Sequence, residues 1–183
     1  MVAYILLFFA VLFPEILNNS RGPVNDPNKR HLLVDGSNIM HAWPELRTLL
    51  ARDRNAARSR VSLAVAPLHD IEHVRVTLVF DGSGDKLAAE LPSGQATFAH
   101  LHTPAGTTAD EIIVQLVRQS KAPERCLVAT GDRGVRAAIE GLGAAAISAA
   151  DLAGWARRAD ERQVARAAHL GRANDKEWRR GPC

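Results

Sequence analysis

Residues 31–38 of this chain read HLLVDGSN, a short apolar run that ends in an aspartate and a glycine-containing turn. The same form returns at residues 73–84, HVRVTLVFDGSG, where the apolar run ends at Asp81. Short runs that are apolar throughout are typical of strands buried on both faces of a parallel sheet. Because the carboxyl ends of such strands share one edge of the sheet, we expect Asp35 and Asp81 to be neighbours.

The rest of the sequence alternates β-rich and helical patterns. Further strands are predicted at residues 96–102, 125–130 and 144–148. Helices are predicted at residues 44–68 with a break near 53–55, at 108–120, at 133–141 and from about 148 onward. GSN (36–38) and DGSGDK (81–86) are interpreted as turns. Strands separated by helices predict an α/β fold, with a central, mostly parallel sheet covered on both faces.

A third candidate acid begins the helix predicted at 108–120. Asp110 shares a side of that helix with Ile113 and Val117, which carry the apolar stripe. Its neighbour Glu111 lies on the polar face and fits a capping box with Thr108, in which each side chain bonds the other residue's backbone N–H. Glu111 thus has a structural role, so Asp110 is the better candidate for a site.

A fourth acid, Asp132, follows a strand in TGDRG (130–134). It is able to cap the next helix or to ligate a metal, and the Thr130 hydroxyl is able to orient it. Arg133 is a candidate for phosphate contact or for pairing with the acids, and Asn38 can aim its amide toward the strand ends. Capping of the turn or helix that follows is enough to explain the presence of any one of these aspartates. Four of them at one edge predict a site for a hard divalent cation, which prefers oxygen ligands.

Composition and charge narrow the class of protein. The 183 residues suffice for one buried core, and the two cysteines offer no disulfide framework, which favours a cytoplasmic protein. The net charge of +3 is uneven: both ends of the chain are basic, whereas the middle is acidic apart from an arginine-rich stretch at residues 47–60. Basic flanks around an acidic centre suit a protein that binds a polyanion together with divalent cations. The alternative is that the arginines form ordinary solvated helix faces.

The domain organisation is predicted as three parts. Residues 1–30 form an apolar segment and linker, 31–158 the domain, and 159–183 a basic tail. The run at 2–13 is shorter than the roughly 20 residues of a membrane-spanning helix and has no preceding Lys or Arg. Three interpretations of this run remain: a membrane-associating segment, an extra helix docked on the domain, or a start codon assigned too early.

The combination of motifs resembles a known family. LLVDGSNIMHAWPEL (32–46), VTLVFDGSG (76–84), TPAGTTADEII (103–113) and LVATGDRGVRAAIEGLGAAAISAADL (127–152) are similar, in order, to the blocks of YacP-like NYN domains, a branch of the PIN-like nuclease superfamily. The resemblance covers about residues 31–158. It implies a Rossmann-like, three-layer α/β/α fold and a metal-dependent endoribonuclease that uses Mg²⁺ or Mn²⁺. It further implies RNA as the substrate, mRNA at the ribosome as a target, and products with 5′-phosphate and 3′-hydroxyl ends.

The resemblance also implies roles for particular residues. The catalytic metal ligands correspond to the four aspartates Asp35, Asp81, Asp110 and Asp132. The substrate-binding candidates are Asn38, Ser37, Thr130, Arg133 and His41. Ser37 stands where the family often has an aromatic residue, and Gly131 where a serine is usual.

Other chemistries have little support in the sequence. There is no GxSxG, GxxxxGK[ST] or GxGxxG motif, so triad hydrolysis and nucleotide-dependent reactions are disfavoured. His100 and His102 alternate on one predicted strand but lack further zinc-type ligands, so a structural role is expected. A ribonuclease is therefore the leading interpretation, and the alternative is a non-catalytic RNA- or ribosome-binding module.

Overall fold

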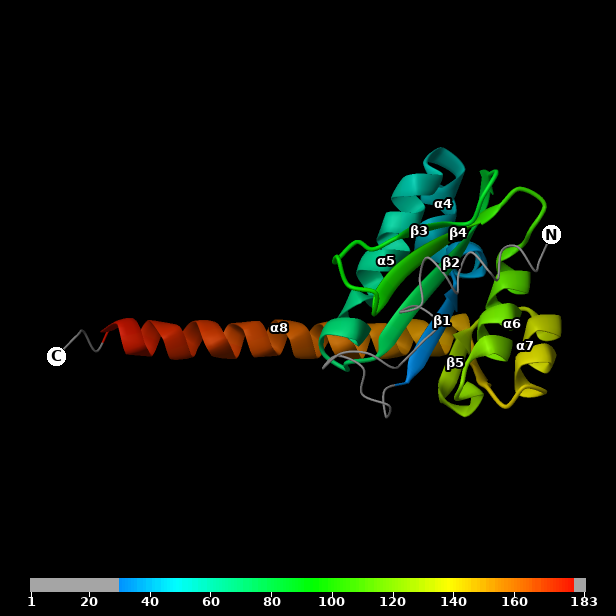
Figure 1. Cartoon of the computed structure of the whole chain (residues 1–183). Helices are drawn as coiled ribbons and strands as arrows, with labels where there is room; N and C mark the ends of the chain where they lie inside the picture. The colour runs from blue at the N-terminus through cyan, green and yellow to red at the C-terminus, as the bar shows by residue number, and fades with distance from the viewer. Residues whose placement is uncertain (1–29, 180–183) are drawn as a thin grey trace.

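The computed structural model describes residues 30–179, which build one six-stranded sheet with helices on both faces (Figure 1). The strand order is β3-β4-β2-β1-β5-β6, and only β3 runs antiparallel to its neighbour. The strands are β1 (His31–Asp35), β2 (Arg75–Gly84), β3 (Ala88–Glu90), β4 (Phe98–Pro104), β5 (Cys126–Ala129) and β6 (Ala145–Ile147). The predicted α/β fold with a mostly parallel sheet is confirmed.

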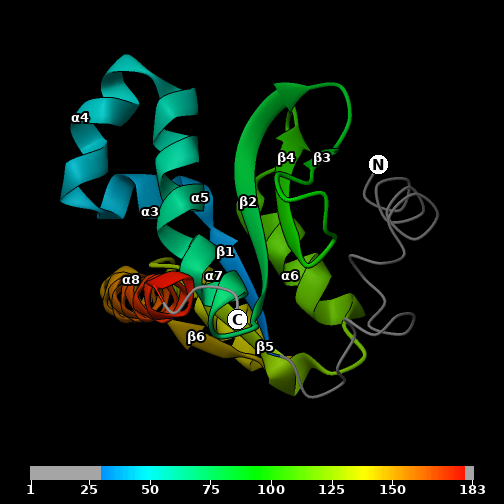
Figure 2. The same cartoon turned by 90° about the vertical axis from the view of Figure 1, so that its left-hand side faces the viewer.

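The helices lie in two layers. They are α3 (Gly36–Ala42), α4 (Pro44–Arg52), α5 (Arg54–Asp70), α6 (Ala109–Gln119), α7 (Arg133–Glu140) and α8 (Ala149–Arg179), with a 3₁₀ turn, η1 (Pro123–Arg125), before β5. One apolar core joins the sheet to α3, α4, α5 and α8, and a second joins its other face to α6 and α7. Figure 2 shows the sheet between these two groups. Because both faces are covered, β1 and β2 are buried almost from end to end.

Register places the strand ends that matter side by side. Asp35, the last residue of β1, pairs with Val79 of β2, two residues before Asp81. On the other side of β1, Val34 pairs with Ala129, the last residue of β5. The ends of β1, β2 and β5 therefore open at one edge of the sheet, close to where α6 and α7 begin.

Three local features differ from the sequence-based expectations. GSN, expected as a turn, begins α3, because the Asp35 side chain accepts a hydrogen bond from Asn38 N and caps a short helix there. DGSG, also expected as a turn, continues β2 past Asp81 with a register shift against β4. Strand β3 was not predicted: its three residues, AAE, carry no alternating pattern of their own and pair only with β4.

The last helix is much longer than its packing requires. Helix α8 is 31 residues long, passes without interruption through the domain boundary predicted at residue 158, and projects away from the sheet (Figure 1). Its first half packs on α5 and buries Leu152, Ala156 and Ala159. Arg162 then pairs with Glu72. No helix within residues 30–179 combines the length and the apolar character needed to cross a bilayer, and the apolar run at 2–13 lies outside the described residues.

Candidate metal centre and nucleic-acid site

Asp35 lies at the centre of the acidic edge. Its side chain is only 3% exposed, and each carboxyl oxygen has a protein donor. Asn38 N donates to Oδ1 at 2.9 Å from α3, and Thr130 Oγ1 donates to Oδ2 at 3.0 Å from the end of β5. A buried carboxyl group is costly unless its oxygens are satisfied, so these two bonds hold Asp35 in one orientation.

Asp81 is fixed by contacts with its neighbours along the edge. Ser37 Oγ accepts a hydrogen bond from Asp81 N at 3.0 Å, which ties the start of α3 to the end of β2. Asp81 Oδ1 accepts from Ala109 N at 2.8 Å, at the first turn of α6. This bond satisfies one of the N–H groups that a helix start leaves free, and it fixes the Asp81 side chain beside the beginning of α6.

Asp110 reaches the edge from the first turn of α6. The predicted capping box is present: Glu111 N donates to Thr108 Oγ1, and Thr108 N donates to a Glu111 carboxylate oxygen, both at 3.3 Å. Glu111 is exposed, whereas Asp110 turns toward the sheet and shares a hydrogen bond with the Asp35 carboxyl group. The structure thus brings Asp110, and not Glu111, to Asp35.

Asp132 and the Thr130 hydroxyl complete the arrangement. Asp132 Oδ1 caps α7 by accepting from Val135 N at 2.9 Å. Thr130 Oγ1, which donates to Asp35, also accepts from Asp132 N at 3.1 Å. Asn38 Oδ1 accepts from Gly131 N at 2.9 Å. The loop after β5 is therefore held to β1 and α3 by side-chain bonds.

The four aspartates influence one another electrostatically. Burial, together with the charge of Asp110 and the hydrogen bond to it, raises the pKa of Asp35 from 3.8 to about 6. The pKa of Asp110 is also raised, first by burial and then by the negative charges of Asp132 and Asp81. Burial is the larger cause in both groups, and repulsion between neighbouring negative charges adds to it. A bound cation would offset that repulsion.

The donor chemistry fits a hard divalent cation, although the side chains as placed pair with each other. Within residues 30–179, no group of three or more His, Cys, Asp or Glu side chains is arranged to hold a metal ion. Asp35 and Asp110 lie beside each other, while one carboxylate oxygen each of Asp81 and Asp132 accepts a hydrogen bond from a helix N–H. Carboxylate oxygens are the ligands that Mg²⁺ and Mn²⁺ prefer, so the chemistry of the donor set, four aspartates, fits such an ion.

The remaining predicted site residues lie farther out. Arg133, in the first turn of α7, is exposed, and so is His41 near the end of α3. The structure records no bond from either side chain to the four aspartates. Both therefore lie on the surface around the acidic edge, and their predicted role in substrate binding is untested by these contacts.

Two glycines next to the aspartates are required by close packing. A Cβ atom on Gly36 would lie 2.2 Å from the Phe80 ring, and one on Gly82 would lie 2.2 Å from the carbonyl oxygen of Thr103. Real Cβ atoms do not approach other atoms so closely. The glycine that follows each of these two aspartates, Asp35 and Asp81, therefore lets the neighbouring element pack directly against it.

A groove beside Asp81 was not predicted. It lies between α5 and the strands β2, β3 and β4, encloses about 430 Å³, and is lined by Arg58, Lys86, Glu90, His102 and the backbone of Gly82–Gly84, among others. Arg58 connects it to the acidic edge by donating from Nη2 to the carbonyl oxygen of Asp81 at 2.6 Å. Apart from Gly82–Gly84, which belong to the DGSG motif, no sequence motif marks these residues. Glu90 and His102 come together only through the pairing of β3 with β4.

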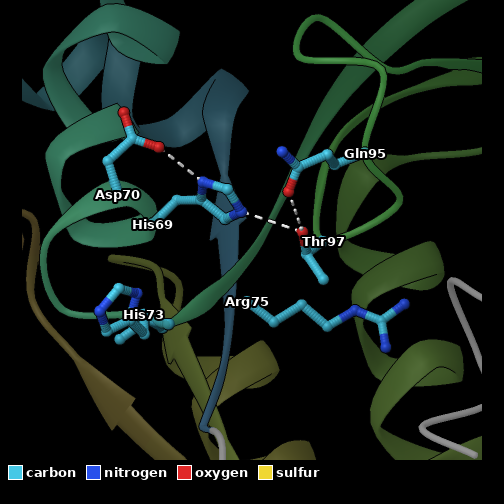
Figure 3. A pocket seen from close by; sticks show the side chains of 7 residues that line it. His69, Asp70, His73, Arg75, Gln95 and Thr97 are labelled. Atoms are coloured by element: carbon cyan, nitrogen blue, oxygen red, sulfur yellow. Dashed lines mark hydrogen bonds and ion pairs between the residues drawn. The ribbon is translucent and has the colours of Figure 1, made fainter. Parts of the chain in front are cut away.

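A second polar cluster lies at the end of α5 (Figure 3). His69 contacts Asp70 Oδ1 from Nδ1 at 2.7 Å and Thr97 Oγ1 from Nε2 at 2.9 Å, and Thr97 donates to Gln95 at 3.4 Å. The adjoining cavity encloses about 240 Å³. It lies where β2 and β4 begin, at the opposite edge of the sheet from the aspartates. These contacts link α5 to the loop before β4, which is a structural role.

Comparison with known proteins agrees with this architecture. The chain is 34% identical over 122 residues to the uncharacterized protein YacP of Bacillus subtilis strain 168, covering 66% of this chain and 71% of that protein. The crystal structure of Rae1 (YacP) from B. subtilis superposes with a TM-score of 0.66 at 28% identity, covering 82% of this chain and 94% of that one. A tryptophan-to-leucine mutant of the same protein gives a TM-score of 0.64 at 29% identity, covering 78% and 84%.

The family assignment follows from a match over most of the chain. Residues 32–180 match the model of the YacP-like NYN domain, including the part of α8 that projects from the sheet. NYN domains are nucleases, so the family implies a nucleic-acid substrate and a metal-dependent reaction. With its sheet order, its acidic edge and this match taken together, the chain belongs to the YacP-like NYN domain family.

Proposed function

We propose that this protein is a metal-dependent endoribonuclease that hydrolyses RNA phosphodiester bonds at the acidic edge of the sheet, with Mg²⁺ or Mn²⁺ bound by Asp35, Asp81, Asp110 and Asp132. The observation that carries the proposal is the convergence of the four acids. Thr130 Oγ1 bonds both Asp35 and the backbone of Asp132, and Asp81 bonds the N–H of Ala109, the residue before Asp110. Carboxylates that cluster for a purely structural role are usually paired with Lys or Arg side chains. Action on mRNA at the ribosome rests on the family resemblance alone.

A bound divalent ion would activate a water molecule and neutralise charge on the scissile phosphate. The chain's own residues supply the positioning. Thr130 holds Asp35 and the backbone of Asp132 through one hydroxyl, and Asn38 holds Gly131. Helix α6 fixes Asp81 through Ala109 N and presents Asp110 beside Asp35. Because the metal would activate the water, no 2′-hydroxyl attack and no catalytic histidine is required, and the products are expected to carry 5′-phosphate and 3′-hydroxyl ends.

The test is cleavage of end-labelled RNA, single-stranded and hairpin, by the purified full-length protein with Mn²⁺, Mg²⁺ or EDTA. Asp35→Asn and Asp110→Asn should each lower the rate by at least about 100-fold, because each removes charge from the ion-binding group. Glu111→Gln is the matched control: it changes the neighbouring acid, which caps α6, and should retain most of the activity.

Three results would count against the proposal. Cleavage that persists in EDTA would exclude a metal-dependent reaction. Cleavage that is equal in wild type and in both asparagine variants would place the activity elsewhere or in a contaminant. RNA binding without any cleavage would favour a non-catalytic binding module.

A further inference from the structure

The groove begins one residue after Asp81 along β2. Its lining residues Gly82–Gly84 follow Asp81 directly in β2, and Arg58 bonds the Asp81 carbonyl oxygen. The Phe80 ring, which packs against Gly36 next to Asp35, also stacks on His102 at a centroid distance of 5.7 Å. The floor of the groove and the acidic edge therefore share the same part of β2. A nucleic-acid strand that lay across the four aspartates would therefore have the groove beside it.

The groove has the dimensions and the backbone of a ligand site. A volume of about 430 Å³ falls in the range of small-molecule pockets, which is about 300–1,000 Å³. Along one wall, β2 shifts its register against β4 between Phe80 and Gly84, so the strand leaves regular pairing there. Shifts of this kind re-aim the backbone beside a site. Gly84 adds no side chain, which leaves this wall open to close approach.

The charges of the groove are suited to a phosphate at one end. Arg58 and Lys86 both line it, and the Arg58 guanidinium also lies 5.6 Å from the centre of the Phe80 ring. Burial lowers the pKa values of His100 and His102, which favours their neutral forms, and His100 Nε2 already bonds Ser62 Oγ at 2.7 Å. Glu90 is the opposing charge: its side chain is 65% exposed and lies 3.7 Å from His102 Nε2.

Two buried nitrogens of this region make no hydrogen bond within residues 30–179, and one of them, His102 Nε2, has only the longer ion-pair contact with Glu90. In the part of the chain that the structure describes, Arg58 Nε and His102 Nε2 are buried nitrogens without a hydrogen bond. A buried polar atom without a hydrogen bond is destabilising, so native structures rarely keep one without a reason. Both belong to residues that line the groove, and the exposed Glu90 side chain lies beside one of them.

From these observations we infer that the groove between α5 and β2–β4 binds one nucleotide of single-stranded RNA next to the scissile bond, with its phosphate at Arg58 and Lys86 and its sugar along Gly82–Gly84 and His102. This inference rests on the proposed ribonuclease function. It adds a substrate-binding site outside the four aspartates, and it makes Lys86 a positioning residue for the substrate strand. Glu90 opposes the phosphate and weakens binding.

The test measures binding without cleavage. A fluorescent single-stranded RNA is titrated with the full-length protein in EDTA at pH 7.5 over a range of salt concentrations. Lys86→Ala should weaken binding about fivefold at 0.1 M salt and reduce the log–log salt slope by about 0.7, the value for one phosphate contact on a single strand. Glu90→Gln should act in the opposite direction and tighten binding, by up to about fivefold. His102→Ala should weaken binding and leave the salt slope unchanged, because burial favours the neutral form of the ring.

Two exposed cations elsewhere on the protein serve as controls. Arg60→Ala changes the other side of α5, and Lys121→Ala changes the turn before η1. If these lower affinity and salt slope as much as Lys86→Ala does, or if Lys86→Ala and Glu90→Gln leave binding unchanged, the inference is wrong. Cleavage is assayed in parallel with Mn²⁺. If the protein cleaves RNA and the groove variants bind RNA as well as wild type does, only the inference about the groove is wrong. If the groove variants change RNA binding but the protein never cleaves, the groove is supported and the proposed ribonuclease function is wrong.

Discussion

The Thr130 hydroxyl donates to Asp35 Oδ2 at 3.0 Å and accepts from Asp132 N at 3.1 Å, so one side chain sets the position of two of the four acids. Thr130→Val keeps the shape and removes both bonds. Loss of bonds that orient metal ligands commonly lowers activity by about 10- to 100-fold. We expect that loss in the RNA cleavage assay, together with a decrease in the free energy of unfolding of about 1–3 kcal/mol in urea titrations.

The matched control is Thr77→Val. Thr77 is also fully buried in the central sheet, and its hydroxyl bonds His31 Nε2 at 2.9 Å, well before the strand ends. This variant should lose stability and keep its cleavage rate per folded molecule. Equal loss of activity in both variants would mean that Thr130 acts through general stability and not through the acids.

The stability of the metal-free protein should depend on the protonation of Asp35. Its pKa is raised from 3.8 to about 6, so between these values the folded chain holds a proton that the unfolded chain releases. The contribution is therefore fully present below about pH 4 and is lost as the pH rises through 6. Urea unfolding in EDTA from pH 4.5 to 7.5 should show wild type losing stability relative to Asp35→Asn. A difference that does not change with pH would contradict the raised pKa.

Divalent cations should reverse this loss near neutral pH. At Mn²⁺ concentrations about 100-fold above the dissociation constant, the free energy of unfolding should rise by about 2.7 kcal/mol, which corresponds to roughly 5–10 °C in melting temperature. Asp110→Asn should abolish most of the shift and Glu111→Gln should preserve it. Differential scanning fluorimetry at pH 7.5 measures both, and an undiminished shift in a double Asp35→Asn, Asp110→Asn variant would locate the ion elsewhere.

Gly36→Ala should be damaging out of proportion to its size. The added methyl group would lie 2.2 Å from the Phe80 ring, and overpacking of this kind is destabilising by about 1–3 kcal/mol. It would also displace Asp35, so cleavage should fall further than stability explains. Gly171→Ala is the control, since nothing lies within 4 Å of that position in α8 and alanine should raise stability by about 0.5–1 kcal/mol.

The sheet and most helices could be predicted because their patterns are local. Apolar runs ended at Asp35 and Asp81, and the Thr108–Glu111 capping box was readable from spacing alone. The choice of Asp110 over Glu111 depended only on which side of a helix each residue occupies, and the structure brings Asp110 to Asp35. These features need no knowledge of distant residues.

The groove and α3 could not be predicted, because both depend on contacts between remote segments. Helix α3 exists as a helix because Asp35, whose position is set partly by Thr130, caps it. The groove needs β3 to return against β4, and a three-residue strand has too few side chains to produce a pattern. Arg58 was interpreted only as part of an arginine-rich stretch, since nothing in the sequence indicates that it bonds Asp81.

Both outer strands of the sheet, β3 and β6, are only three residues long. An outer strand exposes unpaired backbone groups on which another chain can align, and long, flat, apolar examples lead to aggregation. Here the outer strand β3 ends at the exposed Glu90, and the other outer strand, β6, consists only of Ala145–Ile147. The buried parallel strands therefore lie inside a sheet with almost no template for intermolecular β-pairing, which protects a strongly apolar centre from self-association.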